Sequence, residues 1–249
     1  MTPLDPTDCA ARLGEPVAGG GLFMRDALAI RPHAVLDAWL GTVDRRIASV
    51  TAIQPVGSGW RLVDGAGETI VEADIVVVAA GWGAAALRPD LPLSAVRGQA
   101  DWVEDVPGEA VAWGGYAAPT ADGLLFGATH DRGVTALEAD AASSDRNLQT
   151  LAARLPGLAA RVAGAGVRRS RVAIRAVTPD RLPLAGALAP GLFTLTGLGS
   201  RGFCVAPLLA EHVAAVATGA PSPLPVGLEA RVDPQRFVIA GDLAQPLQE

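Results

Sequence analysis

A glycine-rich turn between an apolar run and a helix-like segment constrains this chain most. Gly197, Gly199 and Gly202 follow the pattern G-x-G-x-x-G within "LFTLTGLGSRGFCVAPLLA", residues 192–210. This layout is typical of a dinucleotide-binding turn, but such a turn is followed by a strand that carries an acidic ribose-binding residue. Here the chain becomes proline-rich after Gly219. We therefore interpret the turn as a helix N-terminus suited to an anion, and an ordinary glycine packing turn is the alternative.

A second glycine turn follows an apolar run in the first half of the chain. Gly81, Gly83 and Ala86 form G-x-G-x-x-A directly after residues 75–79. That run is apolar on both faces, which predicts a buried parallel strand. Two nearby prolines limit the next helix to about one turn, too short for a strand-to-strand crossover. Contact with a cofactor and a plain tight turn both remain open for this segment.

The remaining pattern predicts a mixed α/β (α+β) fold in two lobes. Half of the residues are apolar and 18% are charged, which is a globular composition. Alternating apolar residues predict one sheet from strands within 95–106, 110–130 and 168–186, and helices are expected at 33–40, 145–155 and 203–218. We expect one discontinuous lobe from 30–88 and 184–220, a second from 1–29 and 89–183, and an irregular tail from 221–249.

Charge, cysteines and hydropathy exclude several classes of protein. The net charge of −6 does not indicate nucleic-acid binding, and no apolar run is long enough to cross a membrane. The two cysteines are far apart and the three histidines are scattered, so neither a disulfide framework nor a metal site is predicted. The polar, acidic start is not a signal peptide and shows no first strand. We expect a reducing, cytoplasmic location.

Several pieces, in order along nearly the whole chain, resemble the FAD-dependent amine and D-amino-acid oxidase (DAO) superfamily. They are "VVVAAGWG", "VRGQ", "GGYAAPTADGLLFGAT", "IRAVTPDRLPLAG" and "GLGSRGFCVAPLLAE". Four further pieces are similar to the oxidoreductase domain of bifunctional bacterial tRNA 5-methylaminomethyl-2-thiouridine biosynthesis proteins: "GGGLFMRDALAIRPHAVLDAWL", "GATHDRG", "LGSRGFCVAPLLAE" and "LEARVDPQRF". The resemblance implies an FAD-binding Rossmann-like lobe beside a largely antiparallel substrate-binding sheet with helices.

The resemblance also implies a reaction and site residues. The family oxidises a carbon–nitrogen bond, and the tRNA enzyme removes the carboxymethyl group from carboxymethylaminomethyl-(2-thio)uridine at the wobble position, leaving aminomethyl-uridine. Arg175 matches the arginine that binds the substrate carboxylate, and Tyr116 matches a tyrosine that assists it. The matched cofactor-binding residues are Ala80, Gly81 and Trp82 near the adenosine diphosphate, and Gly199, Ser200, Arg201 and Gly202 near the flavin ring. A surface-strand arginine and a packing tyrosine are the alternatives.

Arginines gather at the start of one predicted strand. Arg169, Arg171 and Arg175 share a face by the two-residue period of a strand, and Arg132 lies elsewhere in the sequence. Such a face can steer a polyanion such as tRNA, and a solvated charged face is the alternative.

The family's opening strand, G-x-G-x-x-G loop, helix and acidic residue find no match in this chain. We expect another polypeptide to supply that unit or the chain to be a fragment, and a methyltransferase domain to be a further partner. Without the unit, an open sheet edge and exposed apolar surface are expected. Two other functions remain open: oxidation of a free amino acid or amine such as glycine, sarcosine or a D-amino acid, and a catalytically dead module.

Overall fold

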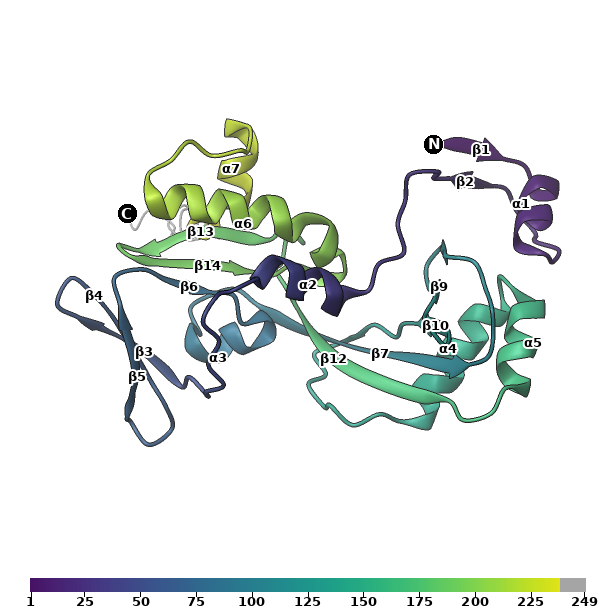
Figure 1. Ribbon diagram of the computed structural model, residues 1–249, viewed down its shortest axis with the longest axis horizontal. Helices are drawn as coiled ribbons and strands as arrows, with labels where there is room; N and C mark the ends of the chain where they lie inside the picture. The colour runs from purple at the N-terminus through teal and green to yellow at the C-terminus, as the bar shows by residue number, and fades with distance from the viewer. Residues whose placement is uncertain (238–249) are drawn as a thin grey trace, which may run out of the picture. The chain divides into compact units, whose positions relative to one another are not determined.

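The computed structural model describes residues 1–237 (Figure 1). These residues form two compact units. Unit 1 comprises Met1–Asp44, Arg97–Asp131 and Ala136–Ala173, and unit 2 comprises Arg45–Val96, Arg132–Thr135 and the chain from Ile174 onward. The predicted mixed α/β class is confirmed. The predicted roles of a cofactor lobe and a substrate lobe stay predictions, and residues 238–249 of the expected tail lie outside the described part.

Unit 1 centres on an antiparallel sheet backed by two helices. The sheet has the order β11-β7-β10-β9-β8, and β12 also pairs with β7. Its strands are β7 (Ser94–Glu104), β8 (Val111–Ala112), β9 (Tyr116–Pro119), β10 (Gly123–Gly127), β11 (Asp131–Arg132) and β12 (Arg169–Val177). The start of β7 up to Val96, Arg132 of β11 and the end of β12 from Ile174 are assigned to unit 2. The two helices that back this sheet are α4 (Ala141–Ala152) and α5 (Pro156–Gly164). This is the alternating-strand sheet that the sequence predicts.

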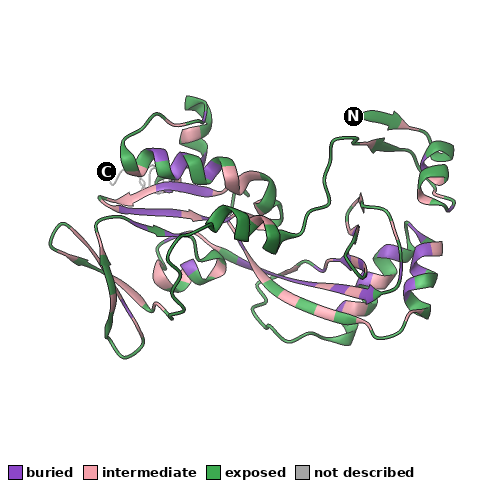
Figure 2. Ribbon diagram, viewed as in Figure 1, coloured by how far each residue is buried: buried purple, intermediate pink, exposed green. Residues whose placement is uncertain are grey.

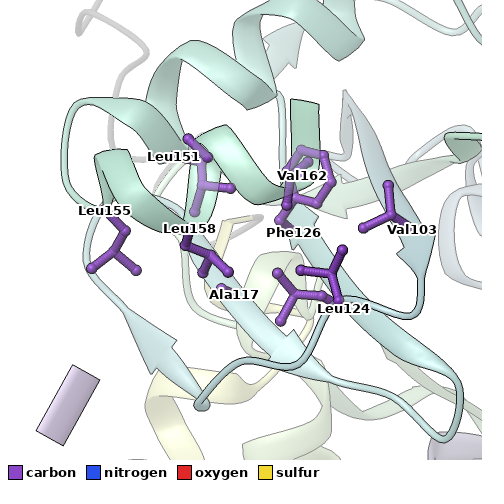
Figure 3. Packing of buried hydrophobic residues seen from close by; sticks show 10 residues of the cluster. Val103, Ala117, Leu124, Phe126, Leu151, Leu155, Leu158 and Val162 are labelled. Carbon is purple, nitrogen blue, oxygen red and sulfur yellow. The ribbon is translucent and has the colours of Figure 1, made fainter. Parts of the chain in front are cut away.

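The core of unit 1 lies between this sheet and the two helices (Figure 3). Leu124 and Phe126 of β10 are fully buried and pack with Leu151 of α4 and Leu158 of α5. Helix α4 begins earlier than the predicted residue 145 because Asp140 is its N-cap, and the Asp140 carboxylate accepts a hydrogen bond from the Ser143 amide at 2.7 Å.

The N-terminal segment corrects the expectation of a start without a strand. It forms β1 (Thr2–Leu4), α1 (Pro6–Leu13), β2 (Gly21–Phe23) and α2 (Pro32–Leu40). The Glu15 carboxylate, after α1, accepts hydrogen bonds from the amides of Gly157 and Leu158 at the start of α5. Helix α2 matches the predicted helix, but none of its residues is buried (Figure 2).

Unit 2 contains two three-stranded sheets. One is the meander β3 (Ala52–Val56), β4 (Gly59–Val63) and β5 (Thr69–Ala73). The other has the order β13-β14-β6, from β6 (Val76–Val78), β13 (Leu184–Ala189) and β14 (Leu192–Thr196). The short helical segments η1 (Gly81–Gly83) and α3 (Ala84–Leu87) follow β6. The short segment η2 (Gly199–Arg201) follows β14 and leads into the long helix α6 (Gly202–Thr218), after which comes the short helix α7 (Val226–Val232). The predicted short helix after the first glycine turn and the helix at 203–218 are both confirmed.

Packing in unit 2 corrects two expectations. Strand β6 is a parallel strand as predicted, and its partner is β14. Ile75 and Val77 are 47% and 45% exposed, so only one face of the run is buried. Among the described strands β6 pairs only with β14, so it carries the expected open edge. The region from residue 221 is not wholly irregular, since α7 packs its buried Val232 against the core of α6 and β13.

No helix among residues 1–237 is long and apolar enough to cross a membrane.

Candidate functional site

The two glycine turns of the sequence lie side by side in unit 2. Strands β6 and β14 are parallel neighbours, with Val77 opposite Phe193, and each runs into a glycine turn. The carboxyl ends of parallel strands share one edge of a sheet, which is where ligands of open α/β sheets bind. The Thr196 hydroxyl donates a hydrogen bond to the Gly81 carbonyl at 2.9 Å and joins the two turns directly.

Backbone conformation explains why glycine occupies these turns. Gly81, Gly197 and Gly199 have φ angles of +56°, +69° and +59°, in the left-handed region that side chains disfavour. A Cβ at Gly197 would also lie 3.0 Å from Cγ2 of Thr178, whereas a Cβ at Gly81 would meet no described atom within 4 Å. Gly197 is thus fixed by conformation and packing together, and Gly81 by conformation alone.

Helix α6 begins at the second turn. Its N-cap residue Arg201 makes no side-chain capping hydrogen bond. The helix dipole favours a negative charge at this end, which is the property expected from the sequence.

The predicted cofactor residues are accessible at this edge of the sheet. Gly81, Ser200 and Arg201 are exposed, as is Ala80, while the remaining three are half-buried: Trp82, Gly199 and Gly202. The structure therefore brings the two sets of predicted residues to one sheet edge, and their contact with a cofactor stays a prediction.

The two predicted carboxylate-binding residues are both half-buried strand residues. Arg175 lies near the end of β12 in unit 2, and Tyr116 opens β9 in unit 1. Their roles stay predictions.

The arginine-rich start of β12 presents its charge outward. Arg169 and Arg171 are exposed, and Arg169 forms an ion pair with Glu104 at 3.0 Å. Just before the strand, Arg168 lines a cavity of about 280 Å³ with Ser144 and Asp145. Its Nε is buried and has no hydrogen-bond partner in the described part of the chain. A buried donor without a hydrogen-bond partner costs folding free energy, so an acceptor bound in this cavity would stabilise Arg168.

Sequence reasoning missed the loop between β12 and β13. Arg236, beyond α7, binds the Asp180 carboxylate through two hydrogen bonds of 2.8 and 3.1 Å. These bonds lower the pKa of Asp180 to about 2. The only sequence signal was the piece "LEARVDPQRF", and a partnership across 56 residues cannot be read from it.

It also missed a buried polar network in unit 1. The Asp101 carboxylate, fully buried, accepts hydrogen bonds from Ser144 Oγ at 2.7 Å, from Asn147 Nδ2 at 2.6 Å and from Ser170 Oγ. Gln99 Nε2 donates to Ser144 Oγ at 2.9 Å in the same network.

Among the residues that the structure describes, no group of three or more His, Cys, Asp or Glu side chains could hold a metal ion. Cys9 and Cys204 are both free thiols.

Comparison with known proteins identifies the family. The model of the family "FAD dependent oxidoreductase" (DAO) matches residues 2–216. The chain is 51% identical over 244 residues to the tRNA 5-methylaminomethyl-2-thiouridine biosynthesis bifunctional protein MnmC of Caulobacter sp. strain K31, which covers 95% of this chain and 40% of the relative. It is 39% identical over 221 residues to the MnmC protein of Maricaulis maris, covering 88% of this chain and 36% of the relative. The chain thus spans about two fifths of the length of these curated relatives.

Solved structures agree with the family. Glycine oxidase from Geobacillus kaustophilus is similar with a TM-score of 0.65 and 27% identity, covering 76% of this chain and 52% of that one. Iminodiacetate oxidase from Chelativorans sp. BNC1 shares the fold with a TM-score of 0.64 at 24% identity, covering 76% of this chain and 53% of that one. The match over most of its length shows that this chain belongs to the DAO family of FAD-dependent oxidoreductases.

Proposed function

We propose that the chain is the FAD-dependent oxidoreductase part of a tRNA wobble-modifying enzyme. It removes the carboxymethyl group from carboxymethylaminomethyl-(2-thio)uridine and leaves aminomethyl-uridine. The observation that carries the proposal is the pair of glycine turns joined by Thr196 and Gly81 at the end of two parallel strands. The 51% identity to a tRNA 5-methylaminomethyl-2-thiouridine biosynthesis protein favours the tRNA substrate.

The residues at the sheet edge fit FAD. The left-handed backbone of Gly81 and Gly199 allows a flat or anionic group to approach, and the positive end of the α6 dipole favours a ring that gains negative charge. We assign the flavin-ring end to Gly199, Ser200, Arg201 and Gly202, and the adenosine diphosphate end to Ala80, Gly81 and Trp82. Bound FAD supplies a two-electron acceptor for hydride from the substrate's carbon–nitrogen bond.

Arg175 is proposed to bind the carboxylate of the carboxymethyl group. Its planar guanidinium can donate two parallel hydrogen bonds to that carboxylate, which fixes the neighbouring CH₂–N group. The proposed assisting role of Tyr116 rests on the family resemblance alone.

The atoms and electrons of the proposed reaction balance with the substrate, FAD and water alone. The substrate loses a hydride from the methylene carbon and a proton from nitrogen, which gives an imine. Water then adds to that carbon and the carbon–nitrogen bond breaks, so the amine stays on the uridine and the two-carbon piece leaves as glyoxylate. The amine must be unprotonated before hydride leaves, so the reaction rate should rise with pH through the pKa of the substrate amine.

Arginines of unit 1 support tRNA as a partner. Arg171 is exposed and forms no ion pair with any described residue. We propose that Arg171, with Arg169 and separately Arg132, contacts tRNA phosphates. Each such contact adds to the salt dependence of binding, so Arg171→Ala should lower the log–log salt slope by about 1.

Two further parts follow from the family likeness. We propose that the first dinucleotide-binding unit and a methyltransferase domain act with this chain, because the relatives are named bifunctional and are longer than it. We also propose a cytoplasmic location, where the tRNA substrate is found.

The test incubates the whole chain and FAD with tRNA that carries carboxymethylaminomethyl-uridine. Nucleoside mass spectrometry should show aminomethyl-uridine and a matching amount of glyoxylate, and Arg175→Lys should reduce both strongly. Arg161→Lys, a change of the same type at an exposed position of α5, is the matched control. A chain that never binds flavin would support the catalytically dead alternative instead.

One observation favours a second function, oxidation of a free amino acid. The solved glycine oxidase is 27% identical and covers 76% of this chain. Turnover of glycine, sarcosine or D-amino acids at rates well above that on tRNA would overturn the tRNA assignment.

A further inference from the structure

The loop between β12 and β13 lies against the second glycine turn of the candidate site. Val177, at the end of β12, bridges to Leu198 within the turn. Thr178 Cγ2 lies 3.0 Å from the position that a Cβ on Gly197 would occupy. Leu184, which opens β13, pairs with Thr196, so the loop sits at the carboxyl end of β14. Its conformation therefore bears directly on the turn.

The loop itself is strained. Arg181 has φ +62°, in the left-handed region that residues with a side chain disfavour. Such residues persist where their surroundings over-determine the backbone, and they gather at functional sites. Inside the loop, the Thr178 hydroxyl donates to the Leu182 carbonyl at 2.6 Å, and the Leu182 amide donates to Asp180 Oδ1 at 3.0 Å.

Arg236, which lies outside the loop, restrains it further. Its guanidinium donates two hydrogen bonds to Asp180 and one to the Leu182 carbonyl at 2.9 Å. It is held in turn by the Asp233 carbonyl at 3.0 Å, and its side chain is only 13% exposed. Pro234, two residues earlier, is buried against β13, since its Cδ lies 3.1 Å from the Cβ position of Gly186. Arg236 is thus held in place by its own segment as well as by its bonds to the loop.

We propose that Arg236 is a positioning residue for the cofactor site. It holds the strained loop 178–182 against the Gly197–Gly199 turn and so fixes the backbone that faces the flavin. The proposal rests on the proposed function for the flavin, and on the contacts above for the restraint itself.

The experiment compares wild type, Arg236→Ala and Arg236→Lys in the whole chain. The matched control is Arg231→Ala, which removes the same charge from an exposed position on α7. Hydrogen exchange reports on the amides of residues 178–182, and titration with FAD gives affinity and the visible spectrum of bound flavin. A double variant, Arg236→Ala with Arg181→Gly, relieves the strain while it removes the restraint.

We expect Arg236→Ala to speed exchange in the loop, to weaken FAD binding about tenfold, a coupling typical of a residue that acts through another, and to alter the flavin spectrum. Arg236→Lys should be intermediate, Arg231→Ala unchanged, and the double variant should recover part of the affinity and spectrum. If Arg236→Ala does not fold, the lysine variant carries the same comparison.

Two results would overturn the proposal: unchanged exchange in the loop, or faster exchange with wild-type FAD affinity and spectrum. Absence of flavin binding by wild type would instead refute the proposed function. In that case the exchange data alone decide whether Arg236 restrains the loop.

Discussion

The interiors of the two units are specified in different ways. In the sheet of unit 1, the carboxylate of Asp101 on β7 is buried and accepts hydrogen bonds from side-chain donors. In the β13-β14-β6 sheet of unit 2, the buried hydroxyls of Thr194 and Thr196 bond only to backbone carbonyls, of Val78 and Gly81. Unit 1 is therefore fixed by partnerships between side chains, whereas the site edge of unit 2 is fixed by backbone conformation.

This difference predicts which property a substitution impairs in each unit. A change in unit 1 leaves buried groups unsatisfied or opens a cavity, so it should appear first as lost stability. A change at the edge of unit 2 leaves the core intact, so it should appear first in the cofactor site.

The largest expected effect is in the apolar core of unit 1. Phe126→Ala removes a fully buried ring, which should lower the free energy of unfolding by about 3–5 kcal/mol. Denaturant unfolding measures it. Leu137→Ala, at a position 63% exposed, is the control and should change little. Equal effects at both positions would contradict the assigned core.

Asp101→Ala should come next, because it removes the acceptor from four side-chain donors at once, those of Gln99, Ser144, Asn147 and Ser170. We expect a loss of about 3 kcal/mol in the free energy of unfolding, since each orphaned donor loses its hydrogen bond. Asp101→Asn keeps the shape and one carbonyl acceptor, so it should cost less. If both variants unfold like wild type, the polar network does not specify unit 1.

Thr196→Val tests the backbone-defined edge of unit 2. It keeps the shape and loses only the 2.9 Å bond to Gly81. The free energy of unfolding should fall by about 1 kcal/mol, while FAD affinity should fall by a larger factor than stability explains. Thr194→Val, which loses the 3.0 Å bond to Val78 away from the turns, should cost similar stability without the affinity loss.

The smallest effect is the pH dependence that Asp180 contributes. Because Arg236 lowers its pKa to about 2, the pair stabilises the fold fully above the unfolded value of about 3.9, and this stabilisation is lost as pH falls toward 2. Asp180 is 35% exposed, so screening limits the contribution to less than about 1 kcal/mol. Denaturant midpoints of wild type and Asp180→Asn should differ at pH 7 and converge near pH 2. A gap that persists at pH 2 would show that the charge is not the cause.

The sequence predicted what local rules control. The glycine spacing at 197–202, the helix that follows and the parallel character of the strand at 75–79 were all predicted, because strand-turn-helix patterning depends on residues near one another. Burial of Ile75 and Val77 was predicted wrongly, because an apolar run does not say whether a sheet covers one face or two.

The helix start at 141 was missed for a related reason. Asp140 caps α4 through the Ser143 amide and also accepts from Arg97 Nη2 at 3.0 Å, a partner 43 residues away. The predicted boundary followed the apolar pattern, which begins later than the cap.

The sequence by itself determined the two glycine turns and the alternating strands of unit 1, since periodicity and glycine conformation depend on residues near one another. Its ordered motifs carried the resemblance to the family. Only the tertiary structure decided that Thr196 joins those turns and that Arg236 restrains the loop beside them. Those contacts span 115 and 56 residues, and their energy depends on an approach that no local pattern encodes.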